Sequence, residues 1–113
     1  MTRLAAILIV FVIATPIVPV PAAAQDSMHL TGAEFLSACT RASPEWISFC
    51  HGYVQAIFDG PRRPGEGICP PVGTTRTMIV ETVVRQLVES PDIDNLSASS
   101  IVYAVLLKDY PCK

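Results

Sequence analysis

The chain has 113 residues, of which eight are basic and ten are acidic, so its formal net charge is −2. The charged residues are spread without long runs of one sign, which argues against binding to nucleic acids and against adhesion to anionic membranes. Half of the residues are apolar, and many of these lie in the N-terminal segment.

This N-terminal segment is predicted to be a cleaved export signal. It has a positive charge at Arg3, an apolar run over residues 4–14 and small residues at 22–24 before Gln25. A membrane-spanning helix would need about 20 apolar residues, and the run meets Pro16 first. We therefore expect residues 1–24 to be removed, which leaves a single exported domain over residues 25–113. The residue directly after the cleavage site is Gln25, so no cysteine is present at that position to accept a lipid anchor.

Two helices are predicted in the first half of this domain. Thr31 and Glu34 have the spacing of a capping box, which predicts a short helix to about Cys39. Ser43 and Pro44 are typical of the start of a second helix. It is expected to end near Asp59, with Gly60 as a left-handed cap. Its apolar residues recur at steps of three and four: Ile47, Cys50, Val54, Ile57 and Phe58.

Two more helices are predicted in the second half, after a loop rich in Pro and Gly at residues 60–73. Thr74 or Thr75 caps the third helix, which ends before Pro91. Its expected apolar stripe is Ile79, Val80, Val83, Val84, Leu87 and Val88. Ser97 or Ser99 caps the fourth helix, which runs to about Tyr110 and has as its apolar residues Ile101, Val102, Val105 and Leu106. The fold class is therefore predicted as a small all-α domain of about four helices.

Four cysteines are expected to form two disulfides, since an exported domain of this size has a modest core. Spacing alone allows three connectivities. A hairpin of the first two helices favours Cys39 with Cys50. A hairpin of the last two places the start of one helix beside the end of the other, which favours Cys69 with Cys112.

Catalytic, metal and cofactor sites are not predicted. His29 precedes the first cap, and Cys50 next to His51 is better explained as a disulfide partner than as a nucleophile, because adjacent helical residues point about 100° apart. The cysteines also lack the paired spacing of a zinc site.

Five charged residues are candidates for partner binding: Arg62, Arg63, Glu66, Asp92 and Asp94. The first three lie on the loop from Pro61 to Glu66, and the last two lie on an acidic turn from Asp92 to Asn95. Charges on exposed loops serve recognition more readily than packing, although a plain solvated loop is the competing interpretation. Because they lie outside the predicted helices, replacing Arg62 and Arg63 with Ala, or Asp92 and Asp94 with Asn, is expected to weaken binding and leave melting unchanged.

The ordered motifs of the chain resemble the Rap/Tai family of immunity proteins. The motifs are Thr31-Gly32-x-Glu34-Phe35-Leu36-x-x-Cys39, Cys50-x-Gly52-Tyr53-x-x-x-Ile57-x-Asp59, Cys69-x-Pro71, Ser90-Pro91 and Tyr110-Pro111-Cys112. Together they cover nearly all of the domain that follows the export signal. The chain departs from the family pattern in its loop after Asp59, which is rich in Pro and Arg, and in the Ser-rich start of its fourth helix.

The resemblance implies a small periplasmic helical protein without catalytic activity. Members of the family include proteins that neutralise peptidoglycan-cleaving amidase effectors delivered by type VI secretion. The implied partner is therefore a cell-wall amidase, and a homodimer is a further possibility. The family shape also resembles the HdeA acid chaperones, so a periplasmic stress chaperone is the alternative function. A small exported enzyme ranks third, because no catalytic constellation is found.

Overall fold

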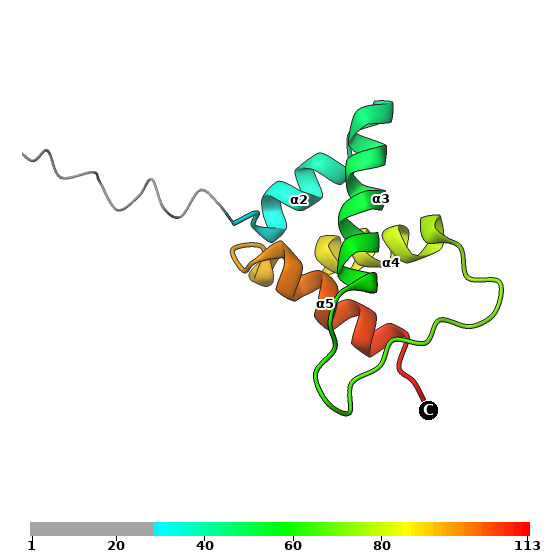
Figure 1. Cartoon of the computed structure of the whole chain (residues 1–113). Coiled ribbons are helices and arrows are strands. Elements are labelled where there is room, and N and C mark those ends of the chain that lie inside the picture. The colour runs from blue at the N-terminus through cyan, green and yellow to red at the C-terminus, as the bar shows by residue number, and fades with distance from the viewer. Residues whose placement is uncertain (1–28) are drawn as a thin grey trace, which may run out of the picture.

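The computed structural model describes residues 29–113 of the chain, and the predicted export signal lies outside them. The described part contains four α-helices, one 3-10 turn and no regular β-strand (Figure 1). In chain order they are α2 (Gly32–Cys39), α3 (Pro44–Asp59), α4 (Arg76–Glu89), η1 (Pro91–Ile93) and α5 (Ala98–Asp109). The predicted all-α fold is confirmed.

The predicted capping box opens α2. The Glu34 amide donates to Thr31 Oγ1 at 3.3 Å, and the Thr31 amide donates to Glu34 Oε2 at 2.9 Å. The next two amides donate to the segment before α5, Gly32 to the Leu96 carbonyl and Ala33 to the Asp94 carbonyl, both at 2.9 Å. A Cβ at Gly32 would lie 2.6 Å from Ile101 Cδ1 and 3.2 Å from that Asp94 carbonyl oxygen, so a larger residue would have to displace these neighbours.

The hydrophobic core lies where the four helices meet, with α3 crossing in front of α4 and α5 in Figure 1. Each helix contributes one buried face, and α5 contributes the most buried residues. The buried residues are Phe35 and Ala38 of α2, Cys50 and Val54 of α3, Val80, Val83 and Leu87 of α4, and Ala98, Ile101, Val102, Val105 and Leu106 of α5.

Two residues of the predicted apolar stripes are exposed. Ile47 is 48 % exposed because it lies in the first turns of α3, the end of the helix that projects beyond α4 and α5 (Figure 1). Val88 is 61 % exposed, since it follows the buried Leu87 by one residue in the last turn of α4 and points about 100° away from it. Val84 is half-buried and packs at the edge of the core.

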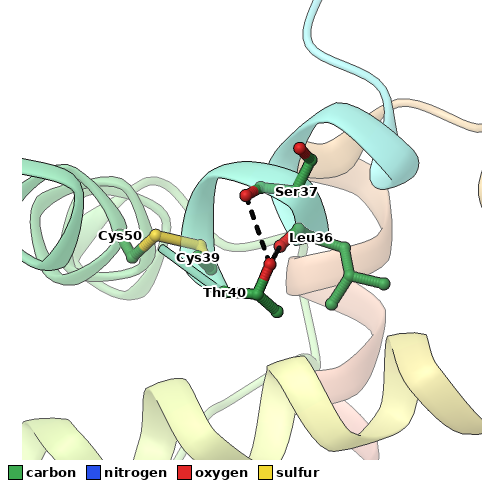
Figure 2. Close-up of a disulfide and its surroundings, with 5 residues drawn as sticks. All are labelled: Leu36, Ser37, Cys39, Thr40 and Cys50. Atoms are coloured by element: carbon green, nitrogen blue, oxygen red, sulfur yellow. Dashed lines mark hydrogen bonds between the residues drawn. A yellow bond between two sulfur atoms is a disulfide. The ribbon is translucent and has the colours of Figure 1, made fainter. Parts of the chain in front are cut away.

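Both predicted disulfides are present. Cys39 at the end of α2 is bonded to Cys50 of α3, with 5.5 Å between their Cα atoms (Figure 2). Beside this bridge Thr40 Oγ1 donates to the carbonyls of Leu36 and Ser37 at 3.0 and 3.2 Å, and the Leu36 carbonyl also accepts from the Thr40 amide at 3.0 Å.

The second disulfide joins the two ends of the α4–α5 hairpin. Cys69 precedes α4 and Cys112 follows α5, and their Cα atoms are 4.8 Å apart. The Cys69 amide also donates to the Tyr110 carbonyl at 2.7 Å, beside an antiparallel bridge between Ile68 and Pro111. The segment before α4 and the segment after α5 are thus joined by a disulfide and by main-chain hydrogen bonds.

Candidate functional site

The loop from Pro61 to Glu66 starts directly after α3, and its first charged residue caps that helix. The Arg62 guanidinium donates to the carbonyls of Ile57 at 3.1 Å and Gly60 at 2.6 Å, and also to that of Phe58. These acceptors lie at the end of the helix, where carbonyls have no intrahelical partner. Arg62 is half-buried. It therefore has a structural role that the sequence analysis did not predict, and its replacement should affect melting.

The predicted left-handed cap at Gly60 is wrong. Gly60 has a φ of −68° and an extended backbone. The Gly60 amide donates to the Ile57 carbonyl at 3.2 Å and the Arg62 side chain donates to the Ile57 and Phe58 carbonyls, so these acceptors are satisfied without a left-handed residue at Gly60. The adjacent Asp59 carboxylate accepts from the Gln55 side-chain amide at 2.9 Å.

The loop is also fastened to α5 through Tyr103. The Arg62 guanidinium lies 5.9 Å from the ring centre of Tyr103 and 5.9 Å from that of Phe58. The Tyr103 hydroxyl donates to Glu66 Oε2 at 2.5 Å, a short hydrogen bond to a charged acceptor. Two of the three candidate residues on this loop are thus joined to the helical scaffold.

Between these two anchors the chain forms a tight turn. The Glu66 amide donates to the Arg63 carbonyl at 3.0 Å, and Gly65 has a φ of +81°. Proline at the second position and a positive φ at the third are the features of a type II turn. Arg63 contributes its main-chain carbonyl to the turn and leaves its side chain exposed.

A surface groove of about 500 Å³ runs beside this turn. Its walls come from the end of α3, the loop and the first half of α5. The lining residues are Ala56, Ile57, Gly60, Pro61, Arg62, Arg63, Ser99, Ser100 and Tyr103. The Ser-rich start of α5, one of the departures from the family pattern, thus lies next to the other departure, the Pro- and Arg-rich loop.

The acidic turn is built differently from the loop. Asp92 lies in η1 and is exposed, whereas Asp94 is half-buried beside the start of α2. Asp94 Oδ1 is buried and has no hydrogen-bond partner within residues 29–113. The exposed charge of this segment is therefore that of Asp92.

The Tyr103 hydrogen bond predicts a distinct alkaline titration. Donation to Glu66 raises the pKa of Tyr103 above its ordinary value of 10.0, since the bond is lost when the phenol ionises. This contribution to stability is fully present below pH 10 and is lost as the pH rises through the raised pKa. Ultraviolet titration of tyrosinate in the Glu66→Ala variant should show one phenol returning toward the ordinary value, and an unchanged titration would contradict the bond.

A second hollow, of about 430 Å³, lies between α2 and the first turns of α3. Trp46 and Phe49 meet edge to face there, with ring centres 5.8 Å apart, and the Arg41 guanidinium lies 4.3 Å from the Trp46 ring centre. Phe49 is 36 % exposed. Aromatic and arginine side chains are common at the centres of protein interfaces.

The two histidines and Cys50 do not form a catalytic group. His29 is exposed at the start of the described residues, and His51 is half-buried on α3. Cys50 is in a disulfide and offers no thiol beside His51. Within residues 29–113 no three potential metal ligands gather, and no helix is long and apolar enough to cross a membrane.

Comparison with known proteins identifies a family. A family model described as Rap1a immunity proteins matches residues 31–112, a range that begins at the α2 cap and ends at the last cysteine. No curated protein and no solved structure matches the chain.

Proposed function

The chain belongs to the family of Rap1a immunity proteins, which implies protection against a secreted effector, and from this premise we propose that it binds and inhibits a peptidoglycan amidase. The amidase is delivered by type VI secretion into the periplasm, where the immunity protein meets it. Inhibition is by occlusion of the amidase cleft, without a reactive side chain on the immunity protein.

The observation that carries this proposal is the family match over residues 31–112, which includes both disulfides and the loop from Pro61 to Glu66. A cross-linked helical scaffold with an anchored loop suits an inhibitor, because a surface that is ordered before binding loses less entropy in the complex. The candidate contacts are the loop and the acidic turn from Asp92 to Asn95.

The proposed location follows from the chemistry of the chain. Disulfides form and persist in oxidising compartments such as the bacterial periplasm, and the chain has two of them. The proposed export signal over residues 1–24 directs the domain there and is then cleaved.

The test is co-expression with a panel of type VI amidase effectors directed to the periplasm, including any encoded beside the gene for this chain. We expect the full chain to prevent the lysis that one of these amidases causes. A variant without residues 1–24 stays in the cytoplasm and should give no protection. Lysis by every amidase in the presence of the full chain would contradict the proposal. Suppression of aggregation of unrelated proteins at low pH would then favour the chaperone alternative.

A further inference from the structure

The charged residues of the loop differ in whether their charges are already engaged within the fold. The Arg62 guanidinium is bonded to carbonyls at the end of α3, and the Glu66 carboxylate accepts from Tyr103 of α5. Arg63 lies between them with an exposed side chain. An engaged charge must break its bonds before it can bind a partner, whereas an exposed one is free to do so.

We infer, building on the proposed function, that the loop from Pro61 to Glu66 is a preorganised binding element with two kinds of residue. Arg62, Glu66 and Tyr103 are positioning residues that hold its shape. Arg63 is the contact residue, and it binds a carboxylate on the partner.

The backbone leaves the loop little freedom on either side of Arg63. The residue before it, Arg62, is bonded to the Ile57 carbonyl of α3, and the residue after it is Pro64, whose ring fixes φ. Gly65 has the positive φ of the turn, and the Glu66 amide closes the turn on the Arg63 carbonyl at 3.0 Å. The backbone that carries Arg63 is thus ordered before binding, so only its own side chain has to be fixed in the complex.

The chemistry of Arg63 indicates what it binds. A guanidinium presents a planar set of donors that matches a carboxylate in a bidentate pair, whereas a lysine offers only a point charge. At an exposed position water competes for the guanidinium and for the carboxylate. The ion pair is therefore stronger when the partner docks beside the groove and excludes water from it. An acidic side chain at the rim of the partner's cleft is therefore the expected counterpart.

The positioning role is tested first in the free protein, by hydrogen exchange of the Glu66 amide measured by NMR. Tyr103→Phe removes only the hydroxyl that bonds Glu66 and should speed this exchange about tenfold. Tyr110→Phe is the matched control, because it removes a hydroxyl of similar burial that bonds Thr82 Oγ1 at 3.2 Å, away from the loop. Arg63→Ala should also leave the exchange unchanged. Equal exchange in Tyr103→Phe and the parent would overturn the positioning role.

The contact role is tested by binding to the amidase that the chain neutralises in the co-expression panel. Arg63→Ala should weaken binding at least tenfold with unchanged melting, and Arg63→Lys should restore only part of the loss. Arg62→Ala should instead lower the melting temperature, because α3 loses its cap. For Tyr103→Phe, the apparent association constant should fall in proportion to the fraction of molecules whose loop keeps the ordered conformation.

The outcomes separate this inference from the proposed function. Binding of Arg63→Ala with the parent's affinity would overturn the contact role, whatever the parent inhibits. If no amidase in the panel binds the parent, the proposed function fails and the Arg63 assignment fails with it. The exchange of the Glu66 amide then still decides whether Arg62, Glu66 and Tyr103 hold the loop.

Discussion

Leu87→Ala should lower the free energy of unfolding by about 2 to 5 kcal/mol. Leu87 is 1 % exposed and belongs to the core cluster to which all four helices contribute. Its truncation leaves a cavity that the disulfide-linked helices cannot readily close, so the cost includes lost contacts as well as lost burial. Denaturant titration followed by circular dichroism measures the change. A loss of this size is a large part of the stability of a small domain.

Val88→Ala is the matched control for this substitution. Val88 is the next residue on the same helix and is 61 % exposed, so its truncation should change the free energy of unfolding by less than about 0.5 kcal/mol. Equal effects of the two substitutions would mean that the face of α4 assigned to the core is wrong.

Removal of the disulfide between Cys69 and Cys112 should cost about 4 kcal/mol, somewhat more than the ~3 kcal/mol expected for the bridge between Cys39 and Cys50. The difference arises because the bridge between Cys69 and Cys112 closes a sequence separation of 43 residues, whereas the bridge between Cys39 and Cys50 closes one of 11. A longer loop gains more freedom in the unfolded chain when the bridge is removed. The double variants Cys69→Ala with Cys112→Ala, and Cys39→Ala with Cys50→Ala, make the comparison by thermal melting.

Burial of the cysteines should raise the cost of removing the bridge between Cys39 and Cys50, which opposes the effect of loop length. Cys50 is 2 % exposed, so its replacement also removes a buried sulfur, whereas Cys69 and Cys112 are both exposed. Melting each double variant with and without a reductant separates the two effects, because the reductant opens its one remaining bridge and keeps those sulfur atoms. If the long-loop bridge then proves the less important one, the entropic account of these disulfides is contradicted.

The helices were predictable from the sequence because their ends are set by local chemistry. The capping box of Thr31 and Glu34, the proline at the start of α3 and the proline after α4 each act within a few residues of themselves. The pairing of Cys69 with Cys112 also followed from the chain order, since antiparallel neighbours place the start of one helix beside the end of the next.

The errors concern contacts that depend on tertiary structure. Helical periodicity puts Ile47 on the same face as Cys50, but it does not show that α3 projects past its neighbours there. The expectation for Gly60 considered only the backbone, whereas the acceptors at the end of α3 are satisfied by the side chain of Arg62. An arginine three residues after a helix end is the one local signal that could have indicated this cap.

The candidate site was predicted as a set of charges, and the structure separates them. Exposure of the loop from Pro61 to Glu66 could be inferred from its prolines and glycines. The partner of Glu66 could not, because Tyr103 is 37 positions away in the chain and is brought to the loop only by the packing of α3 against α5.

The most direct test of the proposed function is the rate of peptidoglycan cleavage by a purified type VI amidase as the domain of residues 25–113 is titrated into the reaction. For one amidase of the panel, we expect cleavage to fall to the background rate at one molar equivalent. The Arg63→Ala variant should need a larger amount to reach the same inhibition. Undiminished cleavage by every amidase in the presence of a several-fold excess of the folded, disulfide-bonded domain would contradict the account.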